Sequence, residues 1–195
     1  MALPDQPKWT EADYLTFERE SDTKHEFIDG QVIAMSGASR RHNLIAGSVH
    51  YSLYGQLRGG PCEVYQADMR VNVRESGLYT YPDLVVVCDT PDMTDDAVDT
   101  LVNPNVIIEV LSPSTERYDR GKKFQHYRQI PSLQAYVLIS QDVPHIETFT
   151  RQPDDAWQLR EASGLDAIVN IPAIDCTLQL SDVYERVTFD ESDDT

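Results

Sequence analysis

The chain is poor in cysteine, with three cysteines among its 195 residues. Cys62, Cys88 and Cys176 stand singly among apolar neighbours, without the paired spacing of a disulfide framework. No Cys/His spacing indicates a zinc site either. We therefore expect three buried free thiols, as in a protein of the reducing cytoplasm.

Long hydrophobic runs are also missing. No stretch approaches the roughly 18 apolar residues that a membrane-spanning helix needs, so no membrane partner is expected. The first residues, MALPDQPKWT, lack the charged start and apolar middle of a signal peptide. Without repeats or an interdomain linker, the chain predicts one domain over residues 10–187. An N-terminal extension (1–9) would precede it, and an acidic disordered tail (188–195) would follow.

Positive charge is scarce, since 16 Lys and Arg residues face 33 Asp and Glu residues, for a net charge of −17. Nucleic-acid binders usually carry a basic surface, because phosphate neutralisation supplies much of their affinity. The charge is unevenly distributed, however. Residues 89–99 and the tail are acidic, whereas residues 117–128 contain five basic residues and one acid. This basic segment is either a track for phosphates or an ordinary solvated helix face.

Helical and extended patterns alternate along the rest of the chain. Capping and apolar spacing predict a short helix at 10–19, a longer one at 39–57, another at 115–130 and a short one from 181. Asp29-Gly30 predicts the turn of a hairpin over 26–35. Strict alternation over 65–74 predicts one strand, antiparallel to the strand that begins near residue 81. Further strands are expected at 106–111, 135–139, 145–150, 157–161 and 177–180. Together they predict an α/β fold with a mixed central β-sheet flanked by helices.

Two of the strand-like runs each contain a single carboxylate. YPDLVVV includes Asp83, and NVIIEV includes Glu109. Because a charge among Val and Ile is costly to desolvate unless it is paired, two such acids on neighbouring strands indicate a shared hard cation, Mg²⁺ or Mn²⁺. The structural alternative is that each acid lies at a strand end and accepts hydrogen bonds. The acidic segment 89–99 lies between the two strands in sequence, so we expect it near the site, where it would repel phosphates.

The predicted helix after Glu109 places three polar residues on one face. Asp119, Lys123 and Tyr127 are four residues apart, which aligns them along the helix. Asp119 is then placed to hold Lys123. The alternatives are a surface ion pair for Asp119 and Lys123, and core packing for Tyr127.

These segments together resemble the Uma-type restriction endonuclease family, a bacterial family within the PD-(D/E)XK nuclease superfamily. The motifs that carry the resemblance are YPD at 81–83, IEVLSPST at 108–115, the spacing of Asp119, Lys123 and Tyr127, and AYVLI at 135–139. KHEFIDG at 24–30 and His42 support it, and it covers nearly the whole chain. The chain departs from the superfamily pattern at Leu111, where a lysine is usual. In this family the lysine looks transferred to the following helix, at Lys123.

The resemblance implies a restriction-endonuclease-like fold and metal-dependent hydrolysis of phosphodiester bonds in nucleic acid, with DNA expected and a homodimer as the assembly. Asp83 and Glu109 would bind Mg²⁺ or Mn²⁺, with Glu26 as a further acidic catalytic residue. Lys123 would stabilise the attacking water or the phosphate, and Tyr127 would hydrogen-bond the phosphate or Glu109. The expected nucleic-acid contacts are His42, Arg117, Arg120, Lys122 and Arg128, although a lone histidine is more often structural.

Two other functions stay open at this point. The first is a catalytically silent interaction protein on the nuclease fold, which the acidic balance and the displaced lysine favour. The second is a hydrolase of a small phosphate compound, for which a negative surface matters less. The joint presence of Asp83, Glu109, Lys123 and Glu26 favours the nuclease, because a site under drift would be expected to lose a member.

Overall fold

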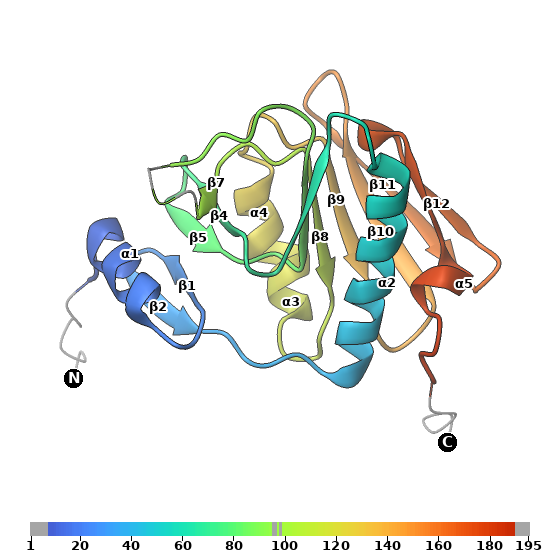
Figure 1. Ribbon diagram of the computed structural model, residues 1–195, viewed down its shortest axis with the longest axis horizontal. Helices are drawn as coiled ribbons and strands as arrows, with labels where there is room; N and C mark the ends of the chain where they lie inside the picture. The colour runs from blue at the N-terminus through green and yellow to red at the C-terminus, as the bar shows by residue number, and fades with distance from the viewer. Residues whose placement is uncertain (1–7, 95–96, 98, 190–195) are drawn as a thin grey trace.

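The computed structural model describes residues 8–94, 97 and 99–189. Most of the predicted N-terminal extension, and the tail from residue 190, lie outside this part. The chain forms a six-stranded sheet, a five-stranded sheet and a separate hairpin, with helices packed against them (Figure 1). None of the helices in the described part is both long and apolar enough to cross a membrane.

The six-stranded sheet is mixed, with the strand order β11-β10-β9-β8-β6-β3. Its strands are β3 (Glu63–Gln66), β6 (Leu84–Val87), β8 (Val106–Val110), β9 (Ala135–Ile139), β10 (His145–Arg151) and β11 (Trp157–Ser163). Only β8 and β9 run parallel in this sheet. A parallel pair needs a crossover, and a helical segment supplies it. That segment consists of α3 (Glu116–Tyr118), a π-helical turn η1 (Asp119–Lys123) and α4 (Phe124–Tyr127).

The five-stranded sheet has the order β2-β1-β5-β4-β7. Its strands are β1 (His25–Ile28), β2 (Gln31–Ala34), β4 (Arg70–Val73), β5 (Leu78–Thr80) and β7 (Thr100–Leu101). The separate hairpin consists of β12 (Ile168–Ile171) and β13 (Cys176–Gln179), joined by the 3-10 turn η2 (Pro172–Ile174). The remaining helices are α1 (Glu11–Glu20), α2 (Arg40–Leu57) and α5 (Leu180–Val183).

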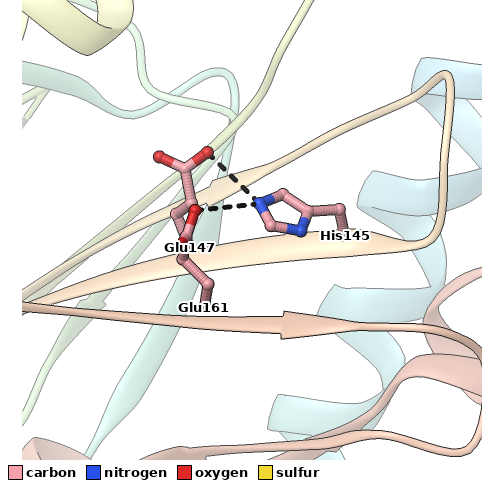
Figure 2. A group of neighbouring side chains, drawn as sticks. All are labelled: His145, Glu147 and Glu161. Carbon is pink, nitrogen blue, oxygen red and sulfur yellow. Dashed lines mark ion pairs between the residues drawn. The ribbon is translucent and has the colours of Figure 1, made fainter.

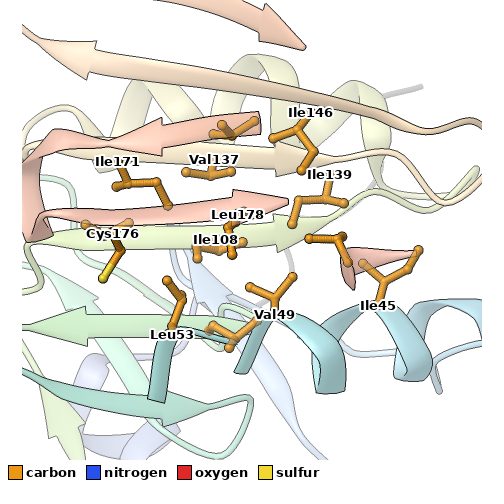
Figure 3. Close-up of a cluster of buried hydrophobic side chains, with 14 of the residues drawn as sticks. Ile45, Val49, Leu53, Ile108, Val137, Ile139, Ile146, Ile171, Cys176 and Leu178 are labelled. Atoms are coloured by element: carbon orange, nitrogen blue, oxygen red, sulfur yellow. The ribbon is translucent and has the colours of Figure 1, made fainter. Parts of the chain in front are cut away.

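The two faces of the six-stranded sheet carry different side chains. Ile108 and Val137 point toward α2, where they pack with Ile45, Val49 and Leu53 (Figure 3). The opposite face packs against α4 through a second cluster of buried side chains, which includes Ile107, Leu138, Tyr127 and Tyr136. Because successive residues of a strand point to opposite faces, Glu109 follows Ile107 to the α4 face.

The strand predicted over 65–74 is two strands. A turn closed by a hydrogen bond from Met69 N to Gln66 O (3.0 Å) separates β3 from β4, and the two belong to different sheets. β3 pairs antiparallel with β6, as expected, whereas β4 pairs with β5. The predicted single sheet is therefore two sheets. Polar and apolar residues still alternate in β4, but all four of its residues are buried, so the alternation does not mark a solvent-exposed face there.

The prediction of three free thiols is wrong for two of them. Cys62 and Cys88 form a disulfide, and Cys176 is free and buried. The two half-cystines flank the β3–β6 pair, in which Glu63 lies opposite Val87, so the register places Cys62 opposite Cys88. The cytoplasmic prediction consequently loses the support that it took from free thiols.

Removing this cross-link should lower the free energy of unfolding by about 2–4 kcal/mol, because the disulfide restricts the unfolded chain across a separation of 26 residues. The measurement is urea denaturation of the Cys62→Ser/Cys88→Ser protein beside wild type, each with and without dithiothreitol. Cys176→Ala keeps the disulfide and is the control, so its stability should fall with the reductant as that of wild type does, whereas the double variant should not respond. Equal stability of oxidised and reduced wild type would contradict the prediction.

Candidate active site

Asp83, the residue just before β6, lies next to Glu109 of the adjacent strand β8. Leu84 pairs with Ile108 in this antiparallel ladder, which brings the preceding Asp83 level with Glu109. The Asp83 backbone N–H donates to Glu109 Oε2 at 3.3 Å, and the Val110 N–H donates to Asp83 Oδ2 at 2.7 Å. The two carboxylates thus share one end of the sheet, as the sequence predicts, and each also accepts the backbone hydrogen bond that the structural alternative proposed.

Lys123 reaches these acids from the crossover helix. Its Nζ lies 2.9 Å from Glu109 Oε1, 3.1 Å from Glu26 Oε1 and 3.5 Å from Asp119 Oδ1. The Lys123 side chain is only 7% exposed, so it is no surface lysine. At position 111, where the superfamily has its lysine, Leu111 packs into the core on the α4 side of the sheet. An ammonium group therefore stands beside Glu109, although it arrives from another element.

Glu26 comes from the five-stranded sheet and is another acid that contacts Lys123. It lies on β1, is nearly buried, and accepts a short hydrogen bond from Thr80 on β5. Asp119, in the π-helical turn, is buried as well. Three of the four carboxylates, those of Glu109, Glu26 and Asp119, therefore contact the Lys123 ammonium, and Asp83 lies beside Glu109.

Tyr127 both packs in the core and hydrogen-bonds Glu109, the two roles that the sequence suggested. Its ring is fully buried and packs edge-on against Tyr136, with ring centroids 5.3 Å apart. Its hydroxyl donates to Glu109 Oε1 at 2.9 Å. Tyr136 in turn donates to the backbone carbonyl of Asp119 at 3.1 Å, which fixes the helical turn above the sheet. Nothing in the sequence pattern pointed to Tyr136 or Thr80, because a tyrosine and a threonine inside strands are ordinary core residues.

His42 lies against the acids from the start of α2. Its backbone N–H donates to the capping Ser39 Oγ at 3.0 Å, and its Nε2 is 3.1 Å from Asp83 Oδ2. Burial opposes protonation of the imidazole, but the Asp83 carboxylate outweighs burial and raises the pKa of His42. A contact with phosphate stays a prediction for this residue.

A cavity of about 520 Å³ opens beside this group. All four acids, Lys123 and His42 line it. Its other walls include the end of β2, the segment 35–39 that leads from β2 to α2, and the segment 112–115 after β8. The charged residues thus have access to a bound molecule.

The electrostatics of the site favour an additional cation. Burial raises the pKa of Glu109 to about 8, the charges of Asp83 and Asp119 add to this effect, and Lys123 opposes it. Burial likewise raises the pKa of Asp119. An excess of carboxylates over ammonium, with hard oxygen donors on two adjacent strands, fits a divalent ion such as Mg²⁺ or Mn²⁺.

The basic segment lies on the outside of the crossover helix. Arg117, Lys122 and Arg128 are exposed. Arg120 instead forms ion pairs with Glu116, at 2.8 Å, and with Glu147 on β10. Within the described residues, none of these four side chains lines the cavity. Their contacts with nucleic acid stay predictions.

None of the described residues of the acidic segment 89–99 lines the cavity, contrary to our expectation that this segment emerges near the site. β6 leads away from Asp83 and β8 leads back to Glu109, so β6 ends and β8 begins at the end of the sheet opposite the two acids. Asp99 pairs with Arg19 (2.8 Å) and Arg70 (2.7 Å). Asp95 and Asp96 lie outside the described residues.

Comparisons with known proteins place the chain in a family. The model of the Uma2 family, described as "Putative restriction endonuclease", matches residues 11–181. An uncharacterized protein of Synechocystis sp. PCC 6803, slr1290, is 33% identical over 183 residues, which cover 94% of this chain and 95% of that protein. A second one, sll1609, is 37% identical over 158 residues, which cover 81% and 89%.

A solved structure shares the fold. It is the crystal structure of a putative nuclease of the DUF820 family from Anabaena variabilis, with a TM-score of 0.74, 18% sequence identity and coverage of 90% of this chain and 97% of that one. The fold is thus the mixed α/β fold of a nuclease-like protein, as the sequence predicts. With the family model matching most of its length, the chain belongs to the Uma2 family of putative restriction endonucleases.

Proposed function

We propose that the protein is a metal-dependent nuclease that hydrolyses phosphodiester bonds, with Asp83 and Glu109 as ligands of Mg²⁺ or Mn²⁺. The observation that carries the proposal is the contact of Lys123 Nζ with Glu109 Oε1 at 2.9 Å, beside Asp83 on the neighbouring strand. Acid, acid and lysine thereby meet at one end of the sheet, and they line a cavity open to a substrate.

A bound divalent ion would polarise the phosphoryl oxygen and lower the pKa of the attacking water. Lys123 acts in this proposal as a fixed positive charge. Although burial opposes its charged form, the carboxylates of Glu109, Glu26 and Asp119 raise the pKa of Lys123 well above its usual value. A permanently protonated lysine cannot remove a proton from water, so it stabilises the charge that develops on the phosphate.

The remaining carboxylates and Tyr127 have supporting parts. Glu26 and Asp119 hold the ammonium in place through contacts of 3.1 and 3.5 Å. Tyr127 orients Glu109 through its hydrogen bond to Oε1. The substrate proposed is nucleic acid, with DNA expected and a homodimer as the assembly that cuts both strands. The described residues of segment 89–99 do not line the cavity, which lessens the repulsion that they would exert on the phosphates of the substrate.

The test is a cleavage assay with plasmid DNA, single-stranded DNA, RNA and bis(p-nitrophenyl) phosphate. We expect Mg²⁺ or Mn²⁺ to support cleavage of at least one nucleic acid, EDTA to stop it, and added metal to restore it. Nucleic-acid binding without cleavage under all conditions would favour the silent interaction protein. Hydrolysis of the small diester alone would favour a hydrolase of small phosphate compounds, and no hydrolysis at all would overturn the proposal.

A further inference from the structure

A second group of side chains that could hold a metal ion, those of His145, Glu147 and Glu161, lies on the β10–β11 hairpin (Figure 2). Glu147 of β10 and Glu161 of β11 are direct cross-strand partners. His145 precedes Glu147 by two residues, so all three side chains point to the same face of the sheet. Their potential ligand atoms lie within 4.8 Å of one another.

We propose that His145, Glu147 and Glu161 form a zinc site. The proposal concerns a different ion from that of the nuclease site and does not depend on that function. Zinc suits this set, because it accepts imidazole nitrogen together with carboxylate oxygen, whereas Mg²⁺ prefers oxygen alone.

The distances favour a shared ion over direct hydrogen bonds. His145 Nε2 lies 3.4 Å from Glu147 Oε1 and 3.6 Å from Glu161 Oε1. Both separations exceed the roughly 2.7–3.2 Å of a hydrogen bond to nitrogen. Ligands about 2.0–2.2 Å from one tetrahedral zinc ion are about 3.3–3.6 Å apart, which matches both separations.

The side chains around the three residues support them as ligands of an ion. His145 Nδ1 lies 2.8 Å from Ser163 Oγ, which holds the ring with Nε2 toward the two carboxylates. Arg120 hydrogen-bonds Glu147, and such second contacts to ligating imidazoles and carboxylates are usual at metal sites. The backbone of His145 is held by hydrogen bonds with the hydroxyl of Tyr184, at 3.1 and 2.9 Å.

The charges of the hairpin call for a cation at this place. Like charges directly opposite each other on paired strands destabilise the pair. Arg120 offsets part of the charge of Glu147, but Arg120 is also paired with Glu116. A zinc ion between the carboxylates would remove the remaining repulsion and tie β11, the outermost strand, to β10.

This site and the candidate active site lie on one row across the sheet. Glu147 pairs with Leu138, and Leu138 pairs with Glu109, so two strand spacings separate the acids. At about 4.8 Å per spacing, the separation is about 10 Å, too far for one ion to contact both. The two sites can therefore be measured independently.

The experiment titrates zinc calorimetrically into the full chain carrying Asp83→Asn, in excess Mg²⁺ to occupy oxygen-ligand sites. We expect one zinc ion per chain in this background. Adding His145→Ala or Glu161→Gln should weaken binding at least about tenfold, since loss of a mere supporting group at a metal site costs about that much. His50→Ala, with its histidine on α2, is the matched control and should bind zinc normally.

Two results would overturn the proposal: absence of stoichiometric zinc binding in the Asp83→Asn protein, and equal zinc affinity with and without His145 and Glu161. The Glu161 side chain is 58% exposed, so Glu161→Gln should fold. If His145→Ala fails to fold, the zinc affinity of Glu161→Gln alone tests the proposal. Anomalous diffraction at the zinc edge from a soaked crystal should place the ion between the three side chains.

Discussion

Replacing Asp83 by asparagine should reduce metal-dependent cleavage by about 10³-fold or more while leaving the protein folded. A catalytic metal supplies several kcal/mol of transition-state stabilisation, and about 1.4 kcal/mol corresponds to a tenfold change in rate. Asparagine keeps an oxygen that accepts the hydrogen bond of the Val110 N–H, found at 2.7 Å in the wild type. It replaces the other carboxylate oxygen by an NH2 group and removes the charge that a metal would need.

Metal-free stability separates this effect from damage to the fold. The Asp83 charge helps to raise the pKa of Glu109, which shows that the two carboxylates repel each other. We therefore expect a nearly unchanged melting temperature for Asp83→Asn in EDTA, because relief of this repulsion offsets the loss of the contact between Asp83 Oδ2 and His42 Nε2 (3.1 Å). Asp154→Asn, an exposed aspartate on the β10–β11 turn, is the matched control and should cleave like wild type. Retained activity in Asp83→Asn would contradict its role as a metal ligand.

Replacing Lys123 by methionine should lower the free energy of unfolding by about 3–5 kcal/mol in EDTA at pH 8. The ammonium contacts Glu109, Glu26 and Asp119, and removal of one partner from a buried ionic group leaves uncompensated charges. Methionine preserves much of the side-chain volume, so lost packing contributes little. Cleavage should be lost as well, because no fixed positive charge would then face the phosphate.

Added Mg²⁺ should recover part of the stability lost in Lys123→Met. A cation among the same carboxylates would replace the missing charge, and an ion that binds only the folded state stabilises it by mass action. The measurement is urea denaturation with Mg²⁺ and with EDTA. The control is Lys122→Met, the exposed neighbouring lysine, which should change stability by less than about 0.5 kcal/mol. A stability of Lys123→Met equal to that of wild type in EDTA would contradict this account.

Much of the candidate site could be predicted because its signals are local. Asp83 and Glu109 stand out as charges within apolar runs, and Lys123 stands out by its spacing from Asp119 and Tyr127. The predicted ends of elements that depend on local chemistry also lie close to the observed ends. The Thr10 cap begins α1 at Glu11, and Asp29-Gly30 forms the β1–β2 turn. Although the crossover contains a π-helical turn, Asp119, Lys123 and Tyr127 still lie near Glu109.

Other features depend on which strands pair with each other, and a local sequence pattern carries no information about strand pairing. The break between β3 and β4 sends two halves of one alternating run into separate sheets, because each half finds a different partner strand. The direction of β6 and β8 decides that their connection leaves and re-enters the sheet at the end opposite the acids. The Cys62–Cys88 disulfide follows from the β3–β6 register, and the group of His145, Glu147 and Glu161 follows from the β10–β11 register. Register is a property of strand pairs, so residues far apart in the chain acquire a shared chemistry only when the sheet forms.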